Sequence, residues 1–482
     1  MKYLLSIAVF LVSTIHVLGD VDSLNQGAVK TWTLEECITY ALSKNLSIVD
    51  QDINVQRATN TYNQDRFDRY PTLNASASHN YNFGRTIDPF TNQFVTDRIQ
   101  SNNFSLTSGV TLYNGGRISN TILRSENEIE RAKFQSQSTV NDISLRVADA
   151  FLQVIFAQNQ LKNFETINKS TTTQLEQAKK LYEAGTTNQR QYLNLKAQDA
   201  RDQMNIQSAK GSIRMAYLRL QQLMQLDLNI EEFAITRPNF DSVSMANQWS
   251  IAGLINNSVS SLPNVKLAES QLRSSTLNID ISKSAFYPRV SVFANVNTLY
   301  SESRLERFNP QLRTSPIGYV EGTNQPVVTE FTSYDTRVSA FGNQLNDNFG
   351  QAVGVSLSVP IFNANQARAS VQDATLAEQQ ARNNLEQTKF GLKADIIQAY
   401  TDFENAVATY NSATENESAQ KDNYEFVQKS AEAGVATTAE LILALNDWSQ
   451  AINDLERARF QLIYSRTVLN FYNTGEVVLS VN

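Results

Sequence analysis

The stretch that decides the fold is TLNASASHNYNF, residues 72–83. Thr, Asn and Ser alternate here without exception with a second set of residues that is mostly apolar. The second set is Leu73, Ala75, Ala77, His79, Tyr81 and Phe83. Because successive side chains of a strand point to opposite faces, a period of two predicts a β-strand. His79 falls near Tyr81 on the apolar face, which favours a position at a membrane interface over a ligand-binding role.

Three later segments repeat this alternation. Their apolar positions are Phe104, Leu106, Val110 and Leu112; Val290, Val292, Ala294 and Val296; and Val353, Val355, Leu357, Val359 and Ile361. About ten residues of this kind are enough for a tilted strand to cross a bilayer, and the uncharged polar face suits a water-filled lumen. One such strand alone would fit a half-buried soluble sheet better. Four of them behind an export signal instead predict a sheet in a membrane.

The N-terminus has the pattern of a secretory signal peptide, which we assign to residues 1–19. Lys2 precedes an apolar run over residues 4–18, and the small residue Gly19 offers a cleavage point. The run has about 15 residues, whereas a membrane anchor needs roughly 20. The sequence therefore predicts export and cleavage.

After Asn114-Gly115-Gly116 the period changes to that of a helix. Apolar residues at alternating spacings of three and four predict a coiled-coil seam in two places. The seams are Val140, Ile143, Val147, Ala150, Val154, Ala157, Leu161 and Phe164, and then Leu392, Ile396, Ala399, Phe403, Ala406, Tyr410 and Ala413. One helix from Arg117 to Glu183 would be about 100 Å long at roughly 1.5 Å per residue. Gly185 then turns the chain into a returning helix. In the second half of the chain the returning helix shows Leu441, Leu445, Trp448, Ile452, Leu455 and Leu462.

Upstream of the first strand, Thr33 and Glu36 form a capping-box pattern. An amphipathic stretch runs from there toward Arg69, and Pro71 follows it. We therefore expect one helix that ends before Pro71.

The chain is internally duplicated. The repeated residues are Trp32 and Trp249, Tyr70-Pro71 and Tyr287-Pro288, Tyr113-Asn114 and Phe362-Asn363, and Glu183-Ala184-Gly185 and Glu432-Ala433-Gly434. The offset grows from 217 to 249 residues, which places an insertion of 32 residues between Pro288 and Phe362. We divide the mature chain into a first repeat, residues 20–240, and a second, residues 241–482. A linker around Arg237-Pro238-Asn239 joins them.

The insertion lengthens the loop at about residues 301–348. This loop holds Pro310, Pro316 and Pro326 together with several charged residues. We expect it to be extracellular, where it could fold over the mouth of a pore.

Composition excludes several classes of function. The mature chain has one cysteine, Cys37, and one histidine, His79, so the sequence offers neither a disulfide framework nor a thiolate or imidazole cluster for metal binding or nucleophilic catalysis. Loss of Lys2 takes the net charge from −7 to −8, which argues against nucleic acid as a partner. We expect no enzyme activity, no cofactor and no metal.

Four strands cannot close a barrel, because the smallest membrane barrels have about eight strands and an open edge in lipid leaves backbone groups unsatisfied. Two copies would give a narrow barrel filled by side chains. Three copies would give twelve strands and room for a pore.

Several features resemble the TolC-like family of outer-membrane efflux proteins, and the match covers nearly the whole mature chain. They are Thr33-Leu34-Glu35-Glu36 before Ala41-Leu42, Tyr70-Pro71, Tyr113-Asn114-Gly115-Gly116-Arg117 and both Glu-Ala-Gly turns. The resemblance implies a mixed α and β membrane protein: a homotrimer with four transmembrane strands per protomer, a twelve-stranded barrel in outer-membrane lipid, and coiled-coil hairpins that form a periplasmic α-barrel. It also implies a passive exit duct for tripartite efflux or type I secretion in a Gram-negative-type cell.

The same resemblance implies two partners, a periplasmic adaptor (membrane fusion) protein and an inner-membrane transporter that delivers the cargo. The alternative is a periplasmic coiled-coil adaptor or structural protein without a transmembrane barrel. Such a protein would share the signal peptide and the helical hairpins but would have no use for four membrane-length strands.

The resemblance also places a periplasmic entrance, or gate, at the helical turns. Its candidate residues are Glu183, Gly185, Glu432, Gly434 and Glu440. In some members an acidic residue at the position of Glu440 helps to form a ring at the entrance, and a second acid follows three residues later, where this chain has Leu443. Glu440 would equally suit a helix N-terminus, where an acid interacts favourably with the dipole. Both interpretations stay open at this point.

Overall fold

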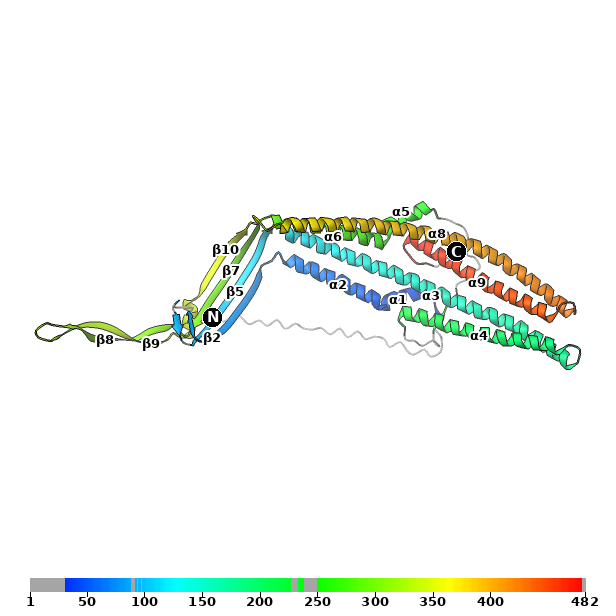
Figure 1. Ribbon diagram of the computed structural model, residues 1–482, viewed down its shortest axis with the longest axis horizontal. Coiled ribbons are helices and arrows are strands. Elements are labelled where there is room, and N and C mark those ends of the chain that lie inside the picture. Colours follow the sequence, from blue (N-terminus) through cyan, green and yellow to red (C-terminus); the bar gives the residue numbers. More distant parts are fainter. Residues whose placement is uncertain are drawn as a thin grey trace.

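The computed structural model describes residues 31–87, 92, 94–96, 98–226, 233–237 and 249–478. The expected signal peptide, residues 1–19, and most of the expected linker lie outside them. The molecule is elongated (Figure 1). A β-sheet lies between a long projecting hairpin at one end and two pairs of long helices at the other.

The first helical segment begins as the sequence predicts, but it is two helices. Thr33 and Glu36 make both hydrogen bonds of a capping box at the start of α1 (Leu34–Lys44). The chain then breaks at Asn45, which has extended backbone angles and caps α2 (Leu46–Phe67) through a bond from the Ser47 amide to its side chain. The expectation of one continuous helix was therefore wrong. Asn competes with helix continuation because its side chain binds nearby backbone amides.

Four antiparallel strands form one sheet in the order β10-β7-β5-β2. They are β2 (Thr72–Asn82), β5 (Ile99–Asn114), β7 (Arg289–Ser301) and β10 (Gly350–Ser358). All four are the strands that the alternation predicts. The last one is shorter than predicted, because Pro360 lacks the amide that would continue the ladder. Val359 and Ile361 therefore lie beyond it.

The register brings polar positions of all four strands onto one face. One row across the sheet consists of Thr72, Gly109, Phe293 and Gly354. The opposite face carries the apolar positions, many of them strongly exposed: Leu73 is 70% exposed and Val353 80%. His79 lies on that apolar face, where its ring is perpendicular to that of Tyr81.

The helices are long and paired. They are α3 (Arg117–Glu183) with α4 (Gln189–Met224), α8 (Gln366–Glu432) with α9 (Thr438–Thr474), and the shorter α5 (Ile251–Ser261) and α6 (Pro263–Lys283), followed by the 3-10 turn η2 (Ser284–Phe286). Both α3 and α8 have 67 residues, as predicted for the first of them. Near the sheet the helices pack in the order α2-α3-α6-α8, so each strand is continued by one helix of the same layer.

Two apolar cores hold the helices together. One surrounds Phe151 and Leu220 and joins α1, α3 and α4. The other surrounds Ile396 and Phe403 and joins α5, α6, α8 and α9. The predicted seams line these cores, since Val147, Val154, Ile396 and Phe403 are at most 1% exposed. The short parallel strands β1 (Thr31–Trp32) and β6 (Ala234–Ile235) lie beside the first core.

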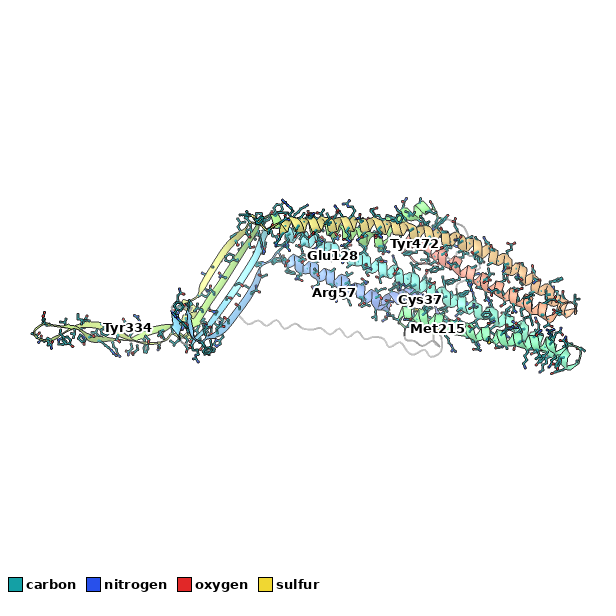
Figure 2. All side chains as sticks on the ribbon, in the orientation of Figure 1. Cys37, Arg57, Glu128, Met215, Tyr334 and Tyr472 are labelled. Carbon is teal, nitrogen blue, oxygen red and sulfur yellow. The ribbon has the colours of Figure 1, made fainter. Side chains whose placement is uncertain are left out.

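The segment predicted as a loop at about residues 301–348 is largely ordered β-structure. Strands β8 (Leu305–Tyr319) and β9 (Pro326–Val338) form a two-stranded ribbon that projects beyond the sheet, with Tyr334 on it (Figure 2). Helix α7 (Phe341–Asp347) fixes its base: Gln344 is fully buried and bonds to the backbone of Ser301 and Ser339. A small hairpin, β3 (Arg85–Ile87) with β4 (Phe94–Thr96), lies in the β2–β5 connection.

No helix within the described part of the chain is long and apolar enough to cross a membrane.

Candidate functional site

The two turns at the far end of the helices have the same geometry. Gly185 and Gly434 have φ angles of 72° and 74°, in the left-handed region where a side chain costs energy. After α3, the Gly185 amide donates to the Tyr182 carbonyl and the Thr186 amide to the Leu181 carbonyl. After α8, the equivalent bonds come from the amides of Gly434 and Val435. These paired bonds are a Schellman motif, which explains why a glycine stands at each turn.

Glu440 lies in the first turn of α9, where it is exposed and caps the helix. Its carboxylate accepts bonds from the Thr437 amide (2.7 Å) and the Thr437 hydroxyl (2.9 Å), while the Glu440 amide donates to that hydroxyl. The bond from the Thr437 amide, followed by that from the hydroxyl, lowers the pKa of Glu440. The equivalent residue at the other turn is the uncharged Gln191, whose amide is capped by the Asn188 side chain. The protomer therefore shows the helix-capping role of Glu440.

Glu183 and Glu432, the other acidic residues predicted at the tip, are exposed and make longer contacts than Glu440 does. Glu183 lies 4.0 Å from the Lys179 ammonium, and Glu432 accepts a 3.4 Å bond from Gln428. A groove of about 770 Å³ between the two helical pairs brings Glu432 together with Lys169 and Lys180. Neither Glu183 nor Glu440 lines this groove.

A buried polar network joins the two helical pairs and was not predicted from the sequence. Asp202 on α4 is 4% exposed and accepts bonds from the Thr171 hydroxyl of α3 (2.6 Å) and the Gln198 amide (2.9 Å). Gln198 also donates to Asn446 of α9, at 2.9 Å. Burial raises the pKa of Asp202, although the bonds from Thr171 and Gln198 oppose this effect. In the sequence, Gln198 and Asp202 have a spacing of four, which is a weak signal for a shared helix face.

A second polar link lies nearby. The Tyr424 hydroxyl of α8 is within 2.6 Å of the Ser170 hydroxyl and accepts a 3.1 Å bond from the Gln174 amide, both on α3. Its ring stacks on Trp448, whose indole N–H donates to Glu417. Near the tip, hydrogen bonds thus join the two helical pairs beside a small apolar cluster in which Ile167 of α3 packs with Leu441 and Leu445 of α9.

A polar hollow of about 680 Å³ separates α2, α3 and α6 close to the sheet. Glu128 of α3 and Arg57 of α2 line it (Figure 2). Glu128 is held by Arg131 at 2.6 Å and by the buried Ser274 hydroxyl at 2.6 Å. The Glu128–Arg131 ion pair and the bond from Arg124 to Asn278 both lie within the protomer, so we assign the hollow a structural role.

Comparison with known families decides the class of protein. The family model for outer membrane efflux proteins matches residues 37–224 and 254–471, which is most of the chain. The chain belongs to this family. It is therefore an outer-membrane efflux channel with a periplasmic part and is not an enzyme. The alternative of a periplasmic adaptor without a membrane sheet is not supported.

Solved structures of similar fold include several outer-membrane channels. The channel OprN has 18% sequence identity and a TM-score of 0.71, and the match covers 92% of this chain and 89% of that one. CmeC of Campylobacter jejuni has 14% identity and a TM-score of 0.70, with coverage of 93% and 86%. The open state of MtrE of Neisseria gonorrhoeae has 15% identity and a TM-score of 0.63, with coverage of 91% and 88%. A search of curated protein sequences found no significant match.

Among the residues that the structure describes, no three His, Cys, Asp or Glu side chains gather as they would around a metal ion.

Proposed function

We propose that this channel is a homotrimer in which three four-stranded sheets close one twelve-stranded barrel in outer-membrane lipid. The helical pairs pack as coiled coils into a periplasmic barrel. The assembly is the passive exit duct of a tripartite efflux or type I secretion system, and a periplasmic adaptor connects it to the inner-membrane transporter that delivers cargo. One observation carries the proposal: within the part of the chain that the structure describes, the sheet and the helical layer both end in edges without a neighbour.

The sheet edges require a neighbour. Strand β2 forms one edge and β10 the other. In lipid, an unpaired edge leaves backbone amides and carbonyls without partners, at several kcal/mol for each group. Pairing of β2 in one copy with β10 in the next would satisfy both edges. Because the two edges differ, this interface is heterologous, and a suitable rotation between copies would close it into a ring.

The helical layer carries stripes of exposed apolar residues on its two outer helices, α8 and α2. On α8, Leu376, Phe390 and Ile397 are 55%, 75% and 48% exposed. On α2, Leu46 and Val49 are 64% and 43% exposed, and Ile53 follows them on the same side. Figure 1 shows α2 and α8 on opposite sides of the helical layer. Apolar stripes of this kind typically mark protein–protein contacts.

Copy number follows from the size of the pore. Two copies would give eight strands, and side chains would fill the interior of so narrow a barrel. Three copies would give twelve strands and a lumen. The uncharged polar face of the sheet would line that lumen, and the exposed apolar face would contact lipid.

Native mass spectrometry in detergent tests the trimer directly, and we expect three chains. Phe390→Asp would place a charge in the apolar contact, and we expect it to yield monomers. Asn384→Asp is the control, because it adds the same charge about 120° around the helix. A stable wild-type monomer with full strand content would refute the proposal.

At the two ends of the duct we propose an entrance and an outer lid. Glu183, Gly185, Glu432, Gly434 and Glu440 surround the periplasmic entrance. The β8–β9 ribbon is the extracellular insertion; it projects beyond the sheet in the protomer and would close the mouth by folding inward. Hydrogen bonds between the helical pairs contribute roughly 1 kcal/mol each, so an adaptor that binds the splayed form better could open the entrance.

A further inference from the structure

The four strands of the sheet carry one charged side chain. It is Arg289, the first residue of β7; the described residues of β2, β5 and β10 include no Asp, Glu, Lys or Arg. Arg289 is exposed and donates a 3.1 Å bond to the hydroxyl of Thr111. Thr111 belongs to the polar face, because it pairs with Ser291, which is two residues from Phe293 and therefore on the same face of β7. The guanidinium therefore lies on the face that would line the lumen.

The neighbouring joint between strands and helices adds basic residues. Arg117 is the first residue of α3, and Arg368 is the third residue of α8. The first acidic residues of these helices are Glu126, nine residues after Arg117, and Asp373, five residues after Arg368. At the end of α6, Asp280 is already paired with Lys283 at 3.0 Å. No acidic residue of the strands offsets Arg289.

Four residues beyond Arg289, the polar face carries an aromatic ring. Phe293 is 45% exposed and lies between Gly109 and Gly354 in the register. A Cβ atom at Gly354 would come within 2.5 Å of the ring, so the far end of the Phe293 ring lies over that glycine. The other residues of this face in the four strands are mostly Ser, Thr and Asn. Phe293 is thus an apolar patch in a polar wall.

We propose that Arg289 and Phe293 form two successive rings in the lumen, one basic and one aromatic. Together they select anionic cargo that has an aromatic or apolar part. This inference rests on the proposed trimer, in which three copies of each residue surround one lumen. The three guanidinium groups attract the anionic part where the cargo enters the strand section. Phe293, about 13 Å further along at roughly 3.3 Å per residue, offers a surface for the apolar part.

The charge can be measured by the reaction of an introduced thiol. Ser291→Cys places a thiol on the lumen face between Arg289 and Phe293, and the native Cys37 is fully buried. We would compare its reaction rates with an anionic and a cationic methanethiosulfonate in purified trimers. We expect Arg289→Gln to lower the anionic-to-cationic rate ratio by about fivefold in 0.1 M salt, whereas Arg289→Lys should preserve it.

A second thiol on the same face serves as the control. Ser76→Cys lies two rows beyond Phe293, more than two screening lengths from Arg289, so its ratio should not respond to Arg289→Gln. An unchanged ratio at Ser291→Cys would overturn the charge assignment. Reaction with neither reagent would show that this face does not line a lumen. Native mass spectrometry of the same samples separates these outcomes from a failure of the trimer itself.

The role of Phe293 is tested by protection. Naphthalene-1,5-disulfonate should slow the modification of Ser291→Cys more than sulfate does at equal concentration, because it can also contact the ring. Phe293→Ala should remove that difference while the charge-dependent ratio is retained. Equal protection by both anions in the wild-type background would refute recognition of the aromatic part.

Discussion

Loss of the Asp202 carboxylate should loosen the packing of α3 against α4. In Asp202→Ala, the Gln198 amide loses one acceptor, and the Thr171 hydroxyl keeps only its 3.3 Å bond to the Ile167 carbonyl. Thr171 and Gln198 are 0% and 3% exposed, so water cannot easily replace the carboxylate. Leaving buried donors unsatisfied costs about 1–3 kcal/mol each, and the fallback bond of Thr171 favours a total near 2 kcal/mol.

Hydrogen–deuterium exchange of the purified protein in detergent measures this loss locally. A loss of about 2 kcal/mol should accelerate amide exchange about 30-fold when exchange follows local opening. The acceleration should appear in the parts of α3 and α4 nearest the Gly185 turn. Asp199→Ala is the matched control: Asp199 accepts bonds from Asn168 and Thr172 but is only half-buried, so water can substitute. We expect less than about a threefold effect there. Equal exchange in both variants would refute the assignment of Asp202 as the critical acceptor.

The same residue should make stability depend on pH. Burial raises the pKa of Asp202 above its unfolded value, so the folded state favours the neutral acid. Its contribution is fully present below the unfolded pKa and is lost as the pH rises through the folded pKa. Asp202→Asn keeps an acceptor but cannot ionise, so protection of α3 and α4 should decline less between these two values. An unchanged pH profile would contradict the burial argument.

Three further predictions concern the two ends of the molecule. A Cys in place of Thr323, at the exposed turn of the β8–β9 ribbon, should react with a bulky maleimide from outside intact cells; reaction only after the outer membrane is opened would show that the topology is wrong. Gly434→Ala should speed amide exchange at the α8–α9 turn by about fivefold through roughly 1 kcal/mol of left-handed backbone strain, since open space surrounds the new Cβ. Gly391→Ala, inside α8, is its control and should not speed exchange. Glu440→Arg should reduce cation preference and change single-channel conductance in planar bilayers without affecting assembly, and an unchanged conductance and selectivity would limit Glu440 to its capping role.

The regular elements were predictable because each depends on a local period. The alternation of residues 72–83 reappears as β2, and the seam that includes Val147 and Val154 is buried in the first core. The glycine turns were also predictable, because Gly185 and Gly434 adopt backbone angles that other residues avoid.

Other features depend on tertiary contacts or on bulges that no period reveals. The prolines at 310 and 316 suggested a loop, yet both lie in β8, where register shifts next to them relieve the missing amides. The Asp202 network joins three helices, and the spacing of Gln198 and Asp202 gives no indication of Thr171 or Asn446. Phe293 lies on the polar face, and its conformation depends on Gly354, which is 61 residues away in the sequence.

Geometry indicates where each proposed constriction acts. Twelve strands at about 4.8 Å spacing and a tilt near 40° give a ring radius of roughly 12 Å, before side chains are added. Twelve helices at about 10 Å spacing give a radius of roughly 19 Å. In the proposed trimer, the entrance near Glu440 would limit flow while the helical tip is closed, and the charge of Glu440 would dominate selectivity. If an adaptor splays the tip as proposed, the strand section would become the narrowest part, and cargo would meet Arg289 and Phe293 at the point where wall and solute are closest.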